Sequence, residues 1–401
     1  MSRQSHLQAT GHLRGIEKSH RSVVWTLVDM TTRKMRRLRV AAILAGLILF
    51  TAPLAAQDLS ANLLWEIGGI DGPEEVMWNR VVKGEIIDDQ IYVLAHFPAI
   101  VGQFTLDGEH VSDLGREGKG PGEFIAPAAV RSEGDSVGLY DFMQRRWLYF
   151  DAQGRHLSTH AWRVHPRIGR SVWTFLGVVG GYFLALTTWL TNDSVHYPPL
   201  LIGWTDPEVV DTLASIPTGL LMARPRGSSQ QWNSRSQGVG AGGGVAQVSD
   251  SIILLLDGMS ARATFYRHTP QGLSVIRTHS LPGEARALTD AEKEEVVHRY
   301  NQRWDHDPDE REYRVPDSVA AWSGVEVSEP GVVWLKRGAT GGLFGGREVW
   351  VRWSPQAETF RRMALPEDVR VLDIDRGLVL ALRRGEFDEP YLQLYRIGDA
   401  N

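Results

Sequence analysis

An internal repeat constrains the fold of this chain more than any other feature. Residues 89–111 align without a gap to residues 135–157, an offset of 46 (91 to 137). Each copy contains alternating apolar residues bounded by Gly and Asp, which predicts strands joined by tight turns. Positions equivalent to Ile91 and Val137 recur at 183, 252, 333 and 379. Six units of four strands, each spanning about 40–50 residues, predict an all-β fold, a six-bladed β-propeller.

The last repeat is one strand short. Segments 370–374, 378–382 and 391–397 supply three strands, and then the sequence ends. The apolar segment 62–67 precedes the first repeat and has no other partner. We expect this N-terminal strand to close the last blade, because joining the two ends removes an open sheet edge.

The first 56 residues differ from the rest in charge and hydropathy. They hold nine of the 43 Lys/Arg and two of the 48 Asp/Glu, so residues 57–401 carry 34 - 46 = -12. The basic segment 35–39, with Arg36, Arg37 and Arg39, the apolar run 40–50 and the small residues up to Ala56 are typical of a signal peptide. The alternative is a retained membrane anchor, although the run is shorter than the ~20 residues of a membrane span. Residues 1–34 are predicted to be disordered or a mis-assigned leader, with residues 57–401 as a periplasmic or extracellular propeller.

Charge and cysteine content narrow the function. An acidic body argues against nucleic acid as a partner. The absence of Cys excludes disulfides, thiolate zinc sites, iron–sulfur clusters and a Cys nucleophile. Common hydrolase, metalloprotease and P-loop motifs are absent as well. We therefore predict a monomer without cofactor or metal, and the sequence favours a non-catalytic protein.

A glycine-rich segment separates the first two repeats: Gly115-Arg116-Glu117-Gly118-Lys119-Gly120-Pro121-Gly122-Glu123-Phe124, followed by Pro127. Here the chain resembles the NHL-repeat-like six-bladed β-propeller family, and within it the exported bacterial 6-bladed β-propeller proteins of unknown function. The resemblance implies a structural linker between blades and no catalytic residue. The linker residues are Gly118, Gly120, Pro121, Gly122, Glu123 and Phe124. The alternative is a backbone cradle for an anion, backed by Arg116 and Lys119.

Two insertions fall in the linkers between blades. Repeat spacings of 69 and 81 residues exceed 46 by 23 and 35, and the extra residues lie largely in 217–244 and 283–317. Linkers between blades share one face with the turns that join second to third strands, and long loops on rigid scaffolds often carry function. Thr289 and Glu292 form a capping box that predicts an amphipathic helix. Its apolar stripe, Val296, Val297, Tyr300 and Trp304, is expected to pack on the propeller rim. A partner-binding helix or a mobile lid are the alternatives.

Candidate ligand-binding residues lie on the same face: His96, Arg145, Trp189, Asp257 and Trp304. Exposed aromatic rings suit sugars and peptides, so the expected ligand is an unidentified protein, peptide or carbohydrate. One alternative is a metal-assisted lactonase-like hydrolase or lyase in the central channel, for which the candidates are Asp141, His96, Asp257 and Glu326. A second alternative is an envelope scaffold anchored in the membrane through residues 35–56.

Two further segments resemble known motifs only in part. Residues 238–243 match G-x-G-x-x-G but lack the preceding strand and following helix, which favours a flexible linker. Residues 305–309 resemble the start of a calcium loop, but Glu310 and Pro316 replace its required Gly and Glu. An acidic surface loop is favoured there over an incidental site for a divalent ion.

Overall fold

A computed structural model describes most of the chain beyond residue 57. The described residues are 58–69, 72, 78–161, 172–179, 182–187, 200–206, 209–215, 221–227, 233–235, 242–269, 272–304, 306–338 and 347–399. All of them fall within the unit Ala56–Asn401. Within these residues no helix is long and apolar enough to cross a membrane, and residues 35–56 lie outside them.

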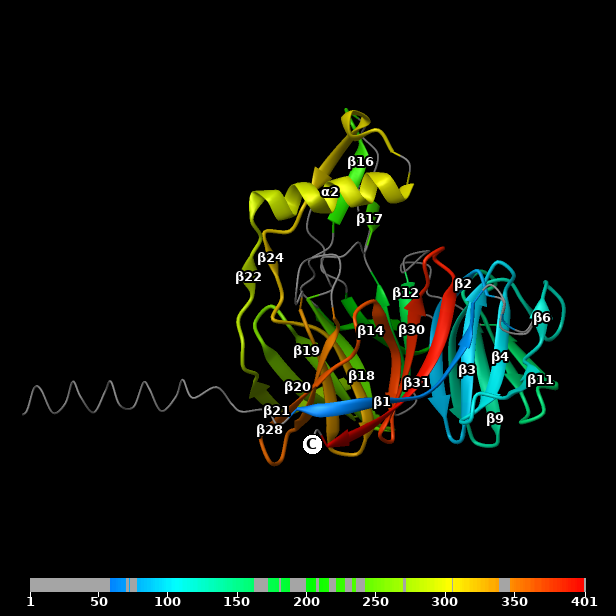
Figure 1. The fold of residues 1–401 in the computed structure, drawn as a ribbon. Coiled ribbons are helices and arrows are strands. Elements are labelled where there is room, and N and C mark those ends of the chain that lie inside the picture. Colours follow the sequence, from blue (N-terminus) through cyan, green and yellow to red (C-terminus); the bar gives the residue numbers. More distant parts are fainter. Residues whose placement is uncertain are drawn as a thin grey trace, which may run out of the picture. The chain divides into compact units, whose positions relative to one another are not determined.

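Six blades of four antiparallel strands form the fold (Figure 1), and a parallel bridge between Leu59 and Met363 joins blades 5 and 6 into one eight-stranded sheet. Blade 1 contains β2 (Arg80–Ile87), β3 (Gln90–His96), β4 (Ile100–Thr105) and β5 (His110–Asp113). Blade 2 contains β8 (Pro127–Glu133), β9 (Ser136–Asp141), β10 (Arg146–Phe150) and β11 (His156–Ala161). Blade 3 contains β12 (Val172–Val179), β13 (Tyr182–Thr187), β14 (Leu200–Asp206) and β15 (Val209–Ser215).

The remaining blades follow the same order along the chain. Blade 4 contains β18 (Gly243–Ser249), β19 (Ile252–Asp257), β20 (Arg262–Thr269) and β21 (Gly272–Ser280). Blade 5 contains β25 (Trp322–Glu329), β26 (Val332–Arg337), β27 (Val349–Ser354) and β28 (Thr359–Ala364). Blade 6 contains β29 (Val369–Asp375), β30 (Leu378–Arg384), β31 (Pro390–Asp399) and β1 (Leu59–Gly68). The six repeat positions predicted from the sequence each lie in the second strand of a blade.

The N-terminal strand closes the ring. β1 pairs antiparallel with β31 from Leu59↔Asp399 to Gly68↔Tyr391, and the two strands run side by side in Figure 1. The indole Nε1 of Trp65 donates a hydrogen bond to Leu106 O of blade 1 at 2.8 Å. The predicted closure is therefore confirmed, and β1 is longer than the segment 62–67 that the sequence suggested.

The core consists of layers between neighbouring blades. One buried cluster joins blades 6 and 1, a second joins blades 1 and 2, and two more join blades 5 and 6 and blades 4 and 5. Trp322 and Trp353, each 1% exposed, belong to the layer between blades 4 and 5. Because each of these four layers takes residues from two blades, blades 1, 2, 4, 5 and 6 depend on their neighbours for burial of their apolar faces.

The two insertions form one substructure. β16 (Leu221–Pro225) from the first insertion pairs with β17 (Asn233–Arg235) and with β23 (Arg311–Arg314) from the second. The second insertion also contains β22 (Arg286–Ala287), α2 (Asp290–Trp304) and the 3-10 helix η2 (Pro308–Glu310). β24 (Ser318–Val319) directly follows the insertion and pairs with β22. The short strands β6 (Arg116–Glu117) and β7 (Glu123–Phe124) belong to the blade 1–2 linker.

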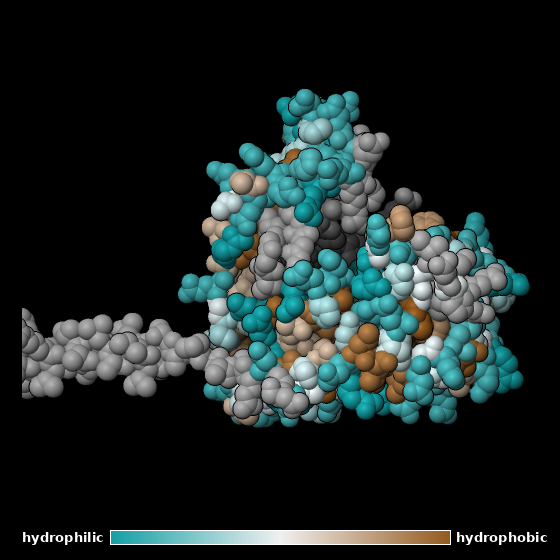
Figure 2. Space-filling model, in the orientation of Figure 1, coloured by the Kyte–Doolittle hydropathy of each residue, from teal (hydrophilic) through white to brown (hydrophobic). Residues whose placement is uncertain are grey.

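The apolar side of α2 is buried within the insertion. Val296 (0% exposed) and Tyr300 (2%) pack with Leu288 and Val319, and Tyr313 of β23 packs against this cluster. The expectation that the stripe packs on the propeller rim is thus wrong for these residues, because strands of the insertion supply their partners. Figure 2 shows that the visible surface of this substructure is largely hydrophilic.

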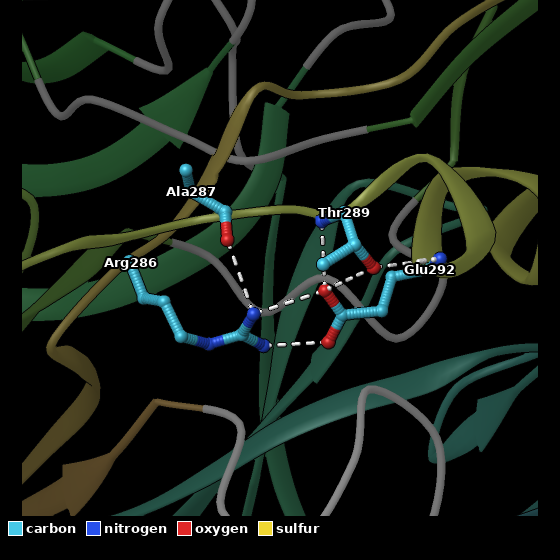
Figure 3. Close-up of polar contacts among 4 residues, drawn as sticks. All are labelled: Arg286, Ala287, Thr289 and Glu292. Carbon is cyan, nitrogen blue, oxygen red and sulfur yellow. Dashed lines mark hydrogen bonds and ion pairs between the residues drawn. The ribbon is translucent and has the colours of Figure 1, made fainter.

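The predicted capping box begins α2 (Figure 3). The Glu292 carboxylate accepts the Thr289 N–H at 2.9 Å, and Thr289 Oγ1 accepts the Glu292 N–H at 3.3 Å. Arg286 adds two hydrogen bonds to the same carboxylate, at 2.7 and 2.9 Å. Its guanidinium, followed by the Thr289 N–H, lowers the pKa of Glu292 to about 2, so the cap is ionised at neutral pH.

Candidate functional site in the central channel

Four charged side chains come from the innermost strands of three blades. Lys83 and Glu85 lie on β2, Glu326 on β25 and Asp373 on β29. These three strands neighbour one another around the axis. All four side chains are partly accessible to water, although their strands are the innermost ones. We therefore assign them to the wall of the central channel.

Hydrogen bonds distribute unevenly over this channel cluster. Asp373 accepts the N–H of Ile86 at 2.7 Å and that of Ile374 at 2.8 Å, so it links blades 6 and 1. Lys83 and Glu85 form an ion pair. The Glu326 carboxylate makes no hydrogen bond or ion pair with any residue that the structure describes.

Burial and like charges shift the acidity of the cluster. Burial, followed by the charge of Asp373, raises the pKa of Glu326 to about 8 against the opposing effect of Lys83. Burial and the Glu85 carboxylate raise the pKa of Asp373 to about 7. Burial alone would lower the pKa of Lys83, but the surrounding carboxylates outweigh it and the net shift is upward. Near neutral pH the cluster therefore holds exchangeable protons, a property common at functional sites.

The cluster was only partly predicted. Glu326 was among the sequence candidates, whereas Lys83, Glu85 and Asp373 were not. The sequence did hold a signal for them. Lys83, Glu85 and Asp373 are charged residues in the first strand of a blade, where most neighbouring repeat residues are apolar. Among the described residues, no group of three His, Asp or Glu is arranged to hold a metal ion.

Three of the predicted ligand-binding residues, His96, Arg145 and Asp257, lie at separate turns of one face, which we call the linker face. Turns and linkers are bonded together there: Phe142 N donates to Ala126 O at 3.0 Å, and Gly258 N donates to Gly242 O at 2.6 Å. His96, Arg145 and Asp257 belong to blades 1, 2 and 4 respectively. Trp189 and the side chain of Trp304 lie outside the described residues.

The side chains of His96 and Asp257 make hydrogen bonds to backbone atoms, His96 to the neighbouring blade and Asp257 within its own turn. His96 Nε2 lies 3.1 Å from Pro127 O of the neighbouring blade. Asp257 Oδ1 accepts the N–H groups of Met259 and Ser260, each at 3.1 Å. Arg145 is exposed and has a positive φ of 53°. The structure therefore gives His96 and Asp257 structural partners, while Arg145 extends from the face.

Asp141, a sequence candidate for catalysis, has a clear structural role. Its side chain is fully buried, and its carboxylate accepts N–H groups from Ile125, Ala126, Met143 and Gln144 at 2.9–3.3 Å. The Gln144 side chain donates to it as well, at 2.7 Å. The carboxylate therefore fastens the blade 1–2 linker to the turn of blade 2.

We expect Asp141→Ala to lower the free energy of unfolding by about 3 kcal/mol, because several buried N–H donors lose their acceptor. Asp135→Ala, at an exposed turn of the opposite face of blade 2, is the matched control and should change stability by less than about 0.5 kcal/mol. Urea denaturation measures both. Equal stability of the two variants would contradict this role.

The glycine-rich linker supplies its own anion. Gly120 N donates to Glu123 Oε2 at 2.8 Å, and Arg116 Nε donates to Glu123 Oε1 at 2.8 Å. Phe124 is fully buried between blades 1 and 2. At Gly115, with φ of 61°, a side chain would collide with the Gly122 carbonyl. The alternative of an external anion bound at Gly120 and Arg116 is thus weakened, since the Glu123 carboxylate occupies both donors.

Each of the two partial motifs is described only in part. Asp307 Oδ1 accepts the Asp309 N–H at 2.9 Å and caps η2. Residues 238–241 and Asp305 lie outside the described residues.

Comparison with known proteins supports the fold. Residues 71–166 match the model of a family described as 6-bladed beta-propeller. A putative exported protein from Bacteroides fragilis superimposes with a TM-score of 0.51 at 11% identity, covering 86% of this chain and 97% of the other. A DUF4221 family member from Bacteroides vulgatus gives 0.51 at 7% identity, covering 86% and 100%. No curated protein sequence matches. The chain is therefore a six-bladed β-propeller, and its first two blades carry the sequence pattern of the matched family.

Proposed function

We propose that this chain is an exported, non-catalytic propeller that binds its ligand at the linker face. The observation that carries the proposal is the joining of the two long insertions through the β16–β23 pair. Arg226 N donates to Glu310 O at 2.7 Å, and Gly227 N donates to Glu312 Oε1 at 3.1 Å, which extends this pairing. A long loop that only connects two blades does not require a packed apolar core of its own. The insertion has one, which fits a surface built for recognition.

Exposed apolar side chains on the linker face support the same proposal. Phe97 is 70% exposed, Met143 63%, and Phe387 74%, and they lie on second-to-third-strand turns of blades 1, 2 and 6. These three blades are consecutive around the ring. Large exposed apolar side chains on adjacent elements often mark binding surfaces.

Export rests on residues 35–56, which have the composition of a signal peptide. The Bacteroides fragilis neighbour, described as exported, is consistent with this location. N-terminal sequencing of the protein from the periplasm or medium should begin at Gln57. Recovery in the membrane fraction with residues 35–56 retained would instead support the anchored-scaffold alternative.

Site-specific photo-crosslinking in exporting cells tests the binding face. A photoreactive residue replaces Phe97, Met143 or Phe387 on the linker face, and Asp89, Asp135 or Gln153 on the opposite face as controls. Intact-mass measurement then detects protein or small-molecule adducts. We expect adducts from linker-face positions only. Adducts confined to the opposite face, or none from either face, would contradict the proposal.

Acid–base catalysis in the channel is the second candidate, favoured by the raised pKa values of Glu326 and Asp373. A hydrolase of this kind should cleave a chromogenic ester or an aromatic lactone, and Glu326→Gln should reduce that rate at least tenfold. Glu329→Gln, an exposed position on the same strand, is the control. Equal rates for the two variants would attribute the cleavage to another site.

A further inference from the structure

Three arginine side chains converge where blades 6 and 1 meet at the linker face. Arg80 begins β2, Arg370 is near the start of β29, and Arg384 ends β30. Arg370 pairs with Leu382 across the strands, so Arg384, two residues further, lies diagonally opposite on the same side of the sheet. The Arg370 guanidinium donates to Val81 O of blade 1 at 3.4 Å, which brings it beside Arg80.

The charges around this arginine cluster do not balance. The guanidinium groups of Arg384 and Arg80 act on Arg370, and the opposing carboxylate is Glu348. Glu348 is itself engaged by Lys336, Trp350 Nε1 and Val371 N. Asp388 lies 3.6 Å from Arg384 and is the second carboxylate nearby. Three arginines and one lysine thus face the two carboxylates of Glu348 and Asp388. Among described residues, no carboxylate pairs directly with Arg80 or Arg370.

The Arg370 side chain is exposed to water at the edge of blade 6 that faces blade 1. Burial among protein atoms is nevertheless the main cause of its lowered pKa, followed by the charge of Arg384. An arginine remains charged there, since its unperturbed pKa lies above about 12. Its positive charge is therefore available to a ligand.

Phe97 and Phe387 lie in the two turns, one of blade 1 and one of blade 6, that adjoin the arginine cluster. Asn79, next to Arg80, donates a hydrogen bond to Phe97 O at 2.5 Å and so fixes that turn beside the cluster. Phe387 lies in the turn that follows Arg384, where its N–H donates to Glu389 Oε2 at 2.8 Å. Arg384 donates to Asp388 O at 2.6 Å in the same turn. The two rings are the most exposed of the large apolar side chains that the structure describes.

We propose that Arg80, Arg370 and Arg384 bind the carboxylate of a small organic acid whose apolar part lies against Phe97 and Phe387. This inference rests on the proposed function and specifies its ligand class. Guanidinium groups match a carboxylate through paired N–H donors, and three of them around one anion relieve their mutual repulsion. The flanking rings remove the apolar part of such a ligand from water. A neutral analogue lacks the first interaction, and a small anion such as acetate lacks the second.

Isothermal titration calorimetry of the exported protein with 3-phenylpropanoate tests the proposal. Acetate, inorganic phosphate and the neutral 3-phenylpropanol are the comparison ligands. We expect 3-phenylpropanoate to bind most tightly, and Arg370→Gln and Arg80→Gln each to weaken it at least tenfold. Arg267→Gln, which removes the same charge from an exposed position of β20 in blade 4, should leave the affinity within twofold.

Thermal unfolding separates lost binding from lost folding. Because Arg370 is surrounded by like charges, Arg370→Gln should unfold at the same temperature as the unsubstituted protein or higher. Tighter binding of phosphate or 3-phenylpropanol than of 3-phenylpropanoate to the unsubstituted protein would overturn the proposal. No binding of 3-phenylpropanoate to that protein would overturn it as well. So would equal affinities of Arg370→Gln and Arg267→Gln for 3-phenylpropanoate. If photo-crosslinking still gives adducts at the linker face in any of these cases, the proposed binding face stands and only the assignment of the ligand to the arginine cluster fails.

Discussion

A chain that begins at residue 69 is expected to lose cooperative folding, whereas a chain that begins at residue 57 folds normally. The longer deletion removes β1, and with it the backbone pairing to β31 from Leu59 to Gly68. It also removes the buried side chain of Leu59, the Trp65 hydrogen bond to blade 1 and the Glu66 ion pair with Arg383. The combined loss should exceed about 5 kcal/mol, which is comparable to the whole stability of many domains. Urea denaturation followed by circular dichroism measures the transition.

A circular permutant distinguishes closure from simple loss of sequence. Residue 399 is joined to residue 58 by a short linker, and new ends are opened at the exposed Gly134, where the structure places no atom against a side chain. This protein retains every strand and should fold as stably as the parent within about 2 kcal/mol. A single sharp transition in the chain that begins at residue 69 would contradict the role of β1, whatever the permutant does.

Stability should fall as the pH rises from about 4.5 to 8. The pKa of Glu326 is about 8 in the folded protein against 4.5 normally, and that of Asp373 is about 7 against 3.8. Over this range the folded state holds protons that the unfolded state has already released, so deprotonation penalises the folded state. We expect the free energy of unfolding to fall by about 3 kcal/mol over this range. This is less than the two pKa shifts alone would give, because water in the channel screens the charges.

Glu326→Gln should flatten this dependence and be more stable than the parent at pH 8, since the amide resembles the protonated acid. Glu329→Gln removes an exposed carboxylate from the same strand and should keep the parent's profile. Urea denaturation between pH 5 and 9 avoids the range in which Lys83 titrates. An unchanged slope in Glu326→Gln would show that the channel carboxylate is ionised in the folded protein throughout.

The repeat made most of the architecture predictable. Apolar alternation located the second strand of every blade, including the ones at 252 and 333 that follow the two longer spacings. The missing strand of blade 6 followed from counting, and the cap of α2 from the spacing of Thr289 and Glu292. These features depend on local pattern or on the strand count, and both can be recovered from sequence.

The functional face was less predictable because its contacts join distant segments. The pairing of β16 with β23 joins two short segments about 90 residues apart, neither of which shows apolar periodicity, so only the folded structure reveals it. The arginine cluster likewise unites Arg80 with Arg370 across the closure between blades 1 and 6. The same closure brings Asp373 to Ile86 in the channel.

The most direct test of binding at the linker face is a crystal structure of the exported protein with 3-(4-bromophenyl)propanoate, in which anomalous scattering locates the bromine. We predict a bromine peak between Phe97 and Phe387, with the carboxylate on Arg370. A peak in the channel beside Glu326, or on the opposite face, would contradict it.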